Sequence, residues 1–192
     1  PAQQYLVNEV TRARVQAAAE TLGYHANAVA QSLRKGTTDT IGVVVADLAN
    51  PFNASILRGI EQVTRSRGIL PLVVETHDRP DLLREAVTRL LGNRVDAIVL
   101  CAAHTSDEEF VTDFARKVPL VLAVRGFGGH LVEDRPVHAP VEVLQDDRLG
   151  ARTAVEHLVQ LGHRLIAQLP GDQTISSFTE RSAGYRTALE AY

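Results

Sequence analysis

The feature that most constrains the fold of this chain is a regular alternation of short apolar runs with longer amphipathic segments. Residues 41–46 are nearly all apolar and mostly β-branched, which is typical of a strand covered on both faces. Further strands are expected at residues 69–74, 95–100, 120–124, 141–144 and 165–169. Helices are expected at residues 51–67, 80–92, 107–117, 147–161 and 182–191. This alternation predicts an α/β fold in which a parallel sheet has helices on both faces.

Two helices are expected before this alternation. Asn8 is suited to cap a helix over residues 9–22, and Gly23 is suited to end it. Residues 28–35 form a second, very short helix, which a glycine and a polar tether join to the first strand. A globular domain has no structural need for a small tethered helix, whereas a regulator that orders or releases a DNA-contacting element does.

Composition narrows the class of protein. The 192 residues could make one large domain or two small ones, and the net charge is −3, so any contact with DNA has to be local. The single cysteine, Cys101, rules out a disulfide framework and favours a reducing compartment. No apolar run approaches the roughly 20 residues that a membrane span needs. The chain contains no methionine, so we expect it to be part of a longer protein.

Signatures of catalysis are missing from the sequence. It contains no G-x-S-x-G elbow, no H-E-x-x-H pair and no phosphate-binding G-x-x-x-x-G-K-[ST] loop. A Rossmann-like enzyme would need a glycine-rich turn after the first strand, where Asp47 and Pro51 stand instead. We therefore expect no enzymatic activity, no cofactor and no metal site.

Ligands of parallel α/β sheets bind beyond the carboxyl ends of the strands. That rule selects Asp47, Asn50 and Phe52 after the first strand, Arg125 after the fourth and Asp146 after the fifth. It also selects three loops, at residues 76–78, 102–105 and 170–181. An aromatic ring among carboxylates, amides and an arginine suits a small polar ligand with an apolar face, such as a sugar or a nucleoside.

Several of these residues have an alternative structural role. Asn50 is favoured as the cap of the helix that begins at Pro51, and Asp47 could simply solvate a strand end. Phe52 could be the first residue of a buried stripe that continues through Ile56, Ile60 and Val63. Surface charge is the simpler expectation for Arg125 and Asp146 taken singly.

Six motifs, in order along the chain, together resemble the lactose-repressor (LacI/GalR) family of transcription regulators. They are N-E-V-T-R-A-R-V-Q-A-A-A-E-T-L-G-Y, N-A-V-A-Q-S-L-R, T-I-G-V-V-V-A-D-L-A-N-P-F, R-V-D-A-I-V-L, H-L-V-Q-L-G-H-R-L-I-A and E-R-S-A-G-Y-R-T-A-L. The resemblance implies a helix-turn-helix headpiece, a hinge helix and a two-subdomain core, like that of periplasmic binding proteins, with the effector in its cleft. Residues 1–36 would hold the headpiece remnant and hinge, 37–146 the first core subdomain, and 147–192 the start of the second.

The resemblance also implies roles for single residues. Leu33 matches the leucine that the family wedges into the minor groove, and Asn27, Ala30 and Arg34 fall where the family contacts the groove or the backbone. The alternative is that Val29 and Leu33 are only the apolar face of a surface helix. Such a helix is below the roughly 12–15 residues of marginal stability, so we expect it to be disordered or frayed without DNA and a partner subunit.

On the effector side, Arg181 matches the family arginine that hydrogen-bonds the effector, and Ser177 falls at a contact position. The alternative for Arg181 is a surface salt bridge. The whole resemblance implies a cytoplasmic, nucleoid-associated bacterial repressor that binds operator DNA as a homodimer and senses a small sugar. The helices at residues 51–67 and 80–93 are candidates for the dimer contact. A periplasmic-type sugar-binding protein remains the alternative, although it would have no use for residues 9–34.

Overall fold

The computed structural model describes residues 8–24, 28–127 and 140–192, and the chain divides into two compact units, Pro1–Thr38 and Asp39–Tyr192. In the first unit, helix α1 spans Glu9–Thr21, and the Asn8 side chain accepts a hydrogen bond of 2.8 Å from the Thr11 amide. Helix α2 spans Ala28–Lys35. Both expected helices and the Asn8 cap are therefore confirmed.

The second unit is built on a five-stranded parallel sheet. Its strands are β1 Thr40–Val45, β2 Leu70–Glu75, β3 Ala97–Leu100, β4 Leu120–Ala123 and β5 Val141–Val143, in the order β2-β1-β3-β4-β5. Every neighbouring pair is parallel. The predicted α/β fold class is confirmed.

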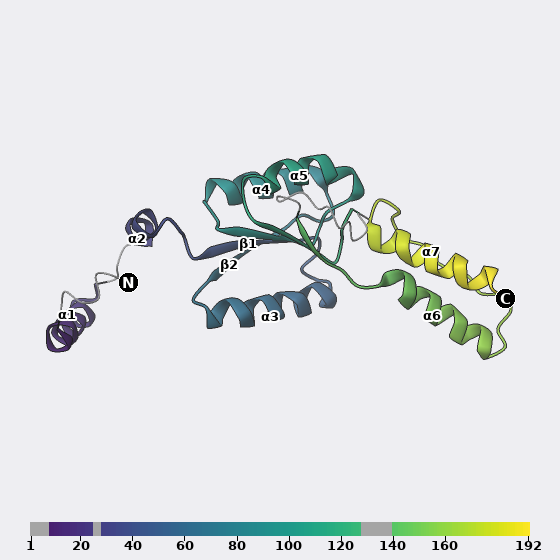
Figure 1. Cartoon of the computed structure of the whole chain (residues 1–192), viewed down its shortest axis with the longest axis horizontal. Helices are drawn as coiled ribbons and strands as arrows, with labels where there is room; N and C mark the ends of the chain where they lie inside the picture. The colour runs from purple at the N-terminus through teal and green to yellow at the C-terminus, as the bar shows by residue number, and fades with distance from the viewer. Residues whose placement is uncertain (1–7, 25–27, 128–139) are drawn as a thin grey trace. The chain divides into compact units, whose positions relative to one another are not determined.

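Helices cover both faces of this sheet. The helices of this unit are α3 Pro51–Ser66, α4 Pro80–Gly92, α5 Glu108–Ala115, α6 Asp147–Gln160 and α7 Ser176–Glu190, with a short 3-10 helix at Thr105–Asp107 before α5. Figure 1 shows α4 and α5 on one face and α3 on the other. Helices α6 and α7 pack along each other (Figure 1).

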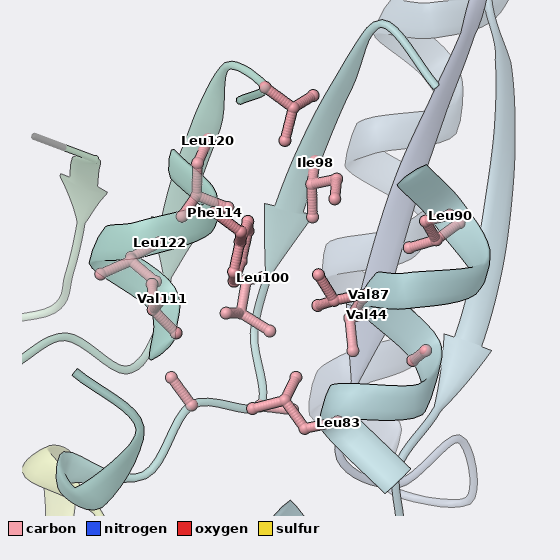
Figure 2. Close-up of a cluster of buried hydrophobic side chains, with 14 of the residues drawn as sticks. Val44, Leu83, Val87, Leu90, Ile98, Leu100, Val111, Phe114, Leu120 and Leu122 are labelled. Carbon is pink, nitrogen blue, oxygen red and sulfur yellow. The ribbon is translucent and has the colours of Figure 1, made fainter. Parts of the chain in front are cut away.

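The main core lies between the sheet and the helices α4 and α5 (Figure 2). Alternate residues of the strands point into it, among them Val44, Ile98, Leu100 and Leu122, and all four are completely buried. The helices contribute Leu83, Val87, Leu90, Val111 and Phe114. Gly42 allows α4 to approach closely, because a Cβ there would lie 2.6 Å from Leu90 Cδ1. This packing holds the carboxyl ends of the strands in fixed register.

The expected buried stripe of α3 is only partly buried, so that prediction is wrong for two of its residues. Phe52 is 44% exposed and Val63 is 52% exposed, while Ile56 and Ile60 pack against the sheet. The buried part of the stripe is therefore its middle, and its two ends, Phe52 and Val63, are exposed.

The strand expected at residues 165–169 is absent, and this prediction is also wrong. Leu165 and Leu169 are both 99% exposed, and no described strand lies beside this segment. An apolar run becomes a strand only where another strand satisfies its backbone groups. Helix α7 begins at Ser176 rather than at residue 182, and no side chain caps its first turn, so its start has no capping signal in the sequence.

Candidate functional site

The loop after β1 is held by its own polar side chains at the carboxyl edge of the sheet. Asp47 Oδ1 accepts a hydrogen bond of 2.7 Å from the Ala49 amide, and the Asp47 carbonyl accepts one of 2.7 Å from Asn53 Nδ2. Asn50 caps α3 by accepting a hydrogen bond of 3.0 Å from the Phe52 amide. The structural role expected for Asn50 is confirmed, and the Asp47 carboxylate lies on a preformed turn.

Phe52 stands in the first turn of α3 with its ring half-exposed. The alternative that Phe52 is a core residue is therefore wrong. Its partly exposed position next to Asp47 is compatible with an aromatic platform for a ligand, a role that stays a prediction.

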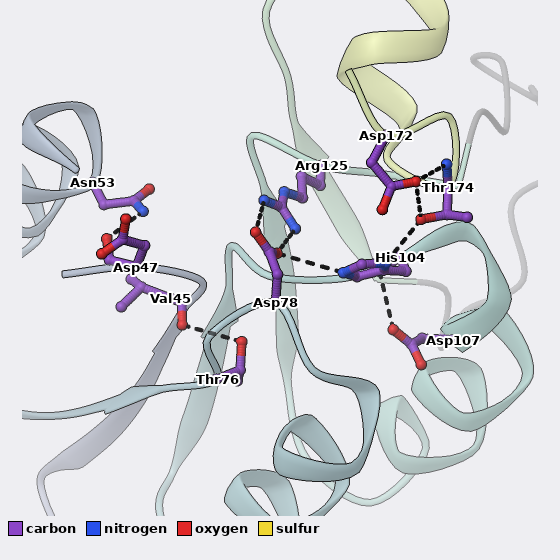
Figure 3. A network of polar contacts seen from close by, with 10 residues as sticks. All are labelled: Val45, Asp47, Asn53, Thr76, Asp78, His104, Asp107, Arg125, Asp172 and Thr174. Atoms are coloured by element: carbon purple, nitrogen blue, oxygen red, sulfur yellow. Dashed lines mark hydrogen bonds and ion pairs between the residues drawn. The ribbon is translucent and has the colours of Figure 1, made fainter. Parts of the chain in front are cut away.

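Arg125 is at the centre of a polar network that the ends of three strands bring together (Figure 3). Its Nη1 and Nη2 donate hydrogen bonds of 2.5 and 3.3 Å to the two carboxylate oxygens of Asp78, which follows β2. The Arg125 side chain is only 12% exposed, whereas that of Asp78 is 43% exposed. The expectation of a simple surface charge is therefore wrong for Arg125.

The backbone before Arg125 is in an unusual conformation. Val124 has φ of 72°, a left-handed value that a β-branched residue rarely adopts. The Arg125 amide donates a hydrogen bond of 2.8 Å to the Ala123 carbonyl, which closes a tight turn directly after β4. Such a conformation costs on the order of 1–3 kcal/mol and persists only where the surroundings enforce it. Here the turn brings the Arg125 side chain to Asp78.

His104, after β3, extends the network toward the loop before α7. Its Nε2 lies 3.4 Å from Asp78 Oδ1, and its Nδ1 lies 3.0 Å from Thr174 Oγ1. The Thr174 hydroxyl donates its one proton to Asp172, over 2.7 Å, so His104 Nδ1 has to be the donor to Thr174. The His104 amide is in turn held by Asp107 Oδ2, at 3.0 Å. His104 therefore joins two parts of the chain that are far apart in sequence.

Two hydrogen bonds from backbone amides reinforce this connection. The Thr105 amide donates a hydrogen bond of 2.8 Å to the Thr174 carbonyl, and the Gly126 amide donates one of 3.0 Å to Ser176 Oγ. The loop before α7 is thereby attached to the ends of β3 and β4.

Two carboxylates of this edge have a lowered pKa. Burial opposes the ionisation of Asp78, but hydrogen bonds and charges from Arg125 and His104 outweigh it, so its pKa lies below the ordinary value. Hydrogen bonds from Thr174 lower the pKa of Asp172. Cys101, at the end of β3, behaves in the opposite way, because burial raises its pKa to about 11 although the charge of Arg125 opposes this.

The remaining predicted effector residues lie on α6 and α7. Asp146 caps α6 by accepting a hydrogen bond of 2.9 Å from the Leu149 amide, so it has a structural role. Arg181 Nε donates a hydrogen bond of 2.7 Å to Asp147, whose side chain is only 10% exposed. Ser177 is buried in the first turn of α7. The effector roles of these residues stay predictions.

In the first unit, two predicted DNA contacts can be located. Leu33 is 70% exposed, and Arg34 lies in the last turn of α2. The backbone of Ala30 belongs to α2, but its side chain, and the whole of Asn27, lie outside the described residues.

Three residues of the network, Asp78, His104 and Thr174, were not singled out from the sequence. All three lie in the loops selected by the strand-end rule, but none belongs to a recognisable motif.

In the described part of the chain, no three or more His, Cys, Asp or Glu side chains are arranged to hold a metal ion. None of the described helices is long and apolar enough to cross a membrane.

A parallel sheet with polar groups gathered at its carboxyl edge is typical of an α/β ligand-binding domain. Residues 38–192 match the family described as periplasmic binding proteins and sugar binding domain of LacI family. The chain belongs to this family, as its resemblance predicted.

Curated relatives are transcription regulators. The regulator GalR of Escherichia coli (strain K12) is 33% identical over 182 residues, which cover 95% of this chain and 51% of GalR. The ribose operon repressor of the same strain is 28% identical over 185 residues, covering 96% of this chain and 54% of the repressor. The chain spans about half the length of these relatives, and both matches extend well beyond residues 38–192.

Solved structures share the fold. The transcriptional regulator CelR in complex with cellobiose has a TM-score of 0.66 and 29% identity, over 97% of this chain and 54% of CelR. The Cra regulator of Pseudomonas putida in complex with fructose 1-phosphate has a TM-score of 0.64 and 24% identity, over 80% of this chain and 54% of Cra.

Proposed function

We propose that the full-length protein is a DNA-binding transcription regulator, a repressor without enzymatic activity, that responds to a small sugar in the bacterial cytoplasm. The observation that carries this proposal is the match to regulators that continues beyond the ligand-binding domain into the first unit. A periplasmic-type sugar-binding protein would have no use for α1 and α2. Binding to operator DNA would associate the regulator with the nucleoid.

On the DNA side, α2 is the proposed hinge helix and Leu33 its minor-groove wedge, with Asn27, Ala30 and Arg34 beside it. Insertion of an apolar side chain unstacks a base step and kinks the duplex, so the wedge has to be exposed in the free protein. The 70% exposure of Leu33 supports this role.

On the effector side, the proposed contacts lie at the carboxyl edge of the sheet and on the first turns of α6 and α7. They are Asp47, Asn50, Phe52, Arg125, Asp146, Ser177 and Arg181. An effector bound there would change how the α6–α7 half meets the sheet, and so bias the order of the hinge helix. Effector and operator affinities are then coupled in both directions.

For the homodimer, the surface formed by α3 and β2 is better suited than α4. Val63, Leu70 and Val73 are 52%, 59% and 43% exposed there, beside a groove of about 280 Å³ lined by α3 and β2. An edge strand with exposed apolar side chains favours association with another chain. Helix α4, the other candidate, packs its apolar face against the core.

The test is operator binding by the full-length protein, measured by fluorescence anisotropy on DNA from its own promoter, with and without candidate sugars. Deletion of residues 28–35 should abolish specific binding, and Leu33→Ala should weaken it by about tenfold or more. Leu33→Met keeps the apolar bulk and should retain most of the affinity. An unchanged operator affinity and sugar response after the deletion would show that the proposal is wrong.

A further inference from the structure

The fold alone leaves the charge of the effector open, because related structures hold a sugar phosphate in one case and an uncharged disaccharide in another. Arginine binds phosphate through a forked, charge-assisted pair of hydrogen bonds, provided that its guanidinium is free. The availability of a free arginine at the carboxyl edge of the sheet therefore bears on which class of effector this chain accepts.

Arginine is found twice in the described loops that follow the strands at this edge. Arg79 is 61% exposed and pairs with Asp81 on the outer side of α4. Arg125 is the buried one and belongs to the network of Figure 3. Arg125 is therefore the arginine of the network that an anion could contact.

Asp78 already occupies the position on Arg125 that an anion would take. Two guanidinium nitrogens donate to the two carboxylate oxygens, which is the same forked geometry that arginine uses for phosphate. His104 approaches the same carboxylate from the other side, at 3.4 Å. An incoming phosphate would have to displace Asp78 from both partners.

The surrounding charges also oppose an anion. The carboxylates of Asp47 and Glu75 hold the loop after β1, and that of Asp172 lies on the His104 side of the network. On α6 and α7, Arg148 pairs with Glu180 and Arg181 pairs with Asp147. Taken together, the described edge presents carboxylates and arginines that carboxylates already neutralise.

We propose that Asp78 is a specificity-determining residue that pairs with Arg125 and thereby prevents anions from binding to it. The effector at this edge is then an uncharged polyhydroxyl compound and not a sugar phosphate. The inference rests on the proposed function, because it takes this edge as the effector site. The half-exposed Asp78 carboxylate can still accept hydrogen bonds from hydroxyl groups. A neutral sugar can therefore bind without breaking the pair.

The experiment uses calorimetric titration of the full-length protein with inorganic phosphate, glucose 6-phosphate and a panel of uncharged sugars. The wild type should bind neither phosphate nor glucose 6-phosphate in the millimolar range. Asp78→Asn keeps the size of the side chain but removes its charge, and should raise phosphate affinity by about tenfold or more, because a charge-assisted forked bond becomes available. The double variant Asp78→Asn, Arg125→Gln should lose this gain.

Asp81→Asn is the matched control, since it removes the same charge from an arginine pair that is fully outside the network. It should leave phosphate binding at the wild-type level. Circular dichroism and thermal unfolding establish that each variant is folded. Phosphate binding by the wild type, no gain in folded Asp78→Asn, or an equal gain in Asp81→Asn would each overturn the inference.

The sugar panel separates this inference from the proposed function. If no sugar binds the wild type, the proposal of sugar sensing fails, and with it the uncharged class of effector. The effect of Asp78 on Arg125 is judged by phosphate alone, so the two failures are distinguishable.

Discussion

Replacement of Gly184 by alanine should destabilise the protein, because α6 and α7 touch at this glycine. A Cβ built on Gly184 would lie 2.1 Å from the carbonyl oxygen of Arg148 in α6, and 3.0 Å from the Arg152 amide nitrogen. Ordinary van der Waals contact begins at 3.4 Å, so the helices would have to separate locally by more than 1 Å. The atoms in the way are backbone and cannot rotate aside.

The magnitude follows from two opposing terms. Overpacking at such a contact costs about 1–3 kcal/mol, occasionally more. Alanine gains up to about 1 kcal/mol over glycine through helix propensity. The clash should prevail, so we expect a net loss of about 1–2 kcal/mol in the free energy of unfolding.

Gly150→Ala supplies the control, because Gly150 lies in α6 and a Cβ there meets nothing within 4 Å. It should stabilise the protein by about 0.5–1 kcal/mol through helix propensity alone. Urea unfolding of the full-length wild type and both variants, followed by circular dichroism, gives the two differences. If Gly184→Ala unfolds at the same urea concentration as Gly150→Ala or a higher one, the close contact between α6 and α7 does not exist.

Three further predictions concern the core and the edge of the sheet. Leu100→Ala should lower the free energy of unfolding, measured in urea, by roughly 3–5 kcal/mol, because Leu100 is completely buried in β3. Leu161→Ala, at a 63% exposed position, should lower it by less than about 1 kcal/mol. Equal losses would contradict the assigned core. Cys101, with its pKa raised to about 11, should react with a thiol reagent at pH 8 only after unfolding, and rapid labelling of the native protein would show that the thiol is accessible. The folded-state pKa of Asp78 lies below its ordinary value of 3.8, so the Asp78–Arg125 pair stabilises the fold above about pH 4 and is lost as the pH falls through the folded pKa. Asp78→Asn should therefore flatten the acid limb of a plot of unfolding temperature against pH, and an unchanged acid limb would count against the pair.

The architecture of the second unit could be predicted because it depends on local periodicity. Runs of apolar residues identify the five strands, and caps such as Asn8 and Asn50 mark where helices begin. The failures occur where an element depends on what lies beside it. Residues 165–169 have the composition of a strand but no pairing neighbour among the described strands, and the two ends of the α3 stripe, Phe52 and Val63, are exposed.

The sequence predicts where the site lies, but not which residues pair within it. The strand-end rule selects the loops that contain Asp78 and His104, because topology brings the carboxyl ends of parallel strands together. The partners within these loops could not be predicted, since Arg125 and Asp78 are 47 residues apart and His104 and Thr174 are 70 residues apart. No local pattern in the sequence records such pairings.

Knowing which residues pair, and not only where they lie, changes the class of ligand that one would infer. Arg125 and Arg181, considered as separate cations near a ligand cleft, would favour an anionic effector. In the structure each arginine has a carboxylate partner from a different element, Asp78 after β2 and Asp147 at the start of α6. An ion pair presents both a donor and an acceptor to a ligand and little net charge, which suits a hydroxyl-rich molecule better than a phosphate. The chemistry of the edge therefore depends on which carboxylate each arginine meets, and not on the number of arginines.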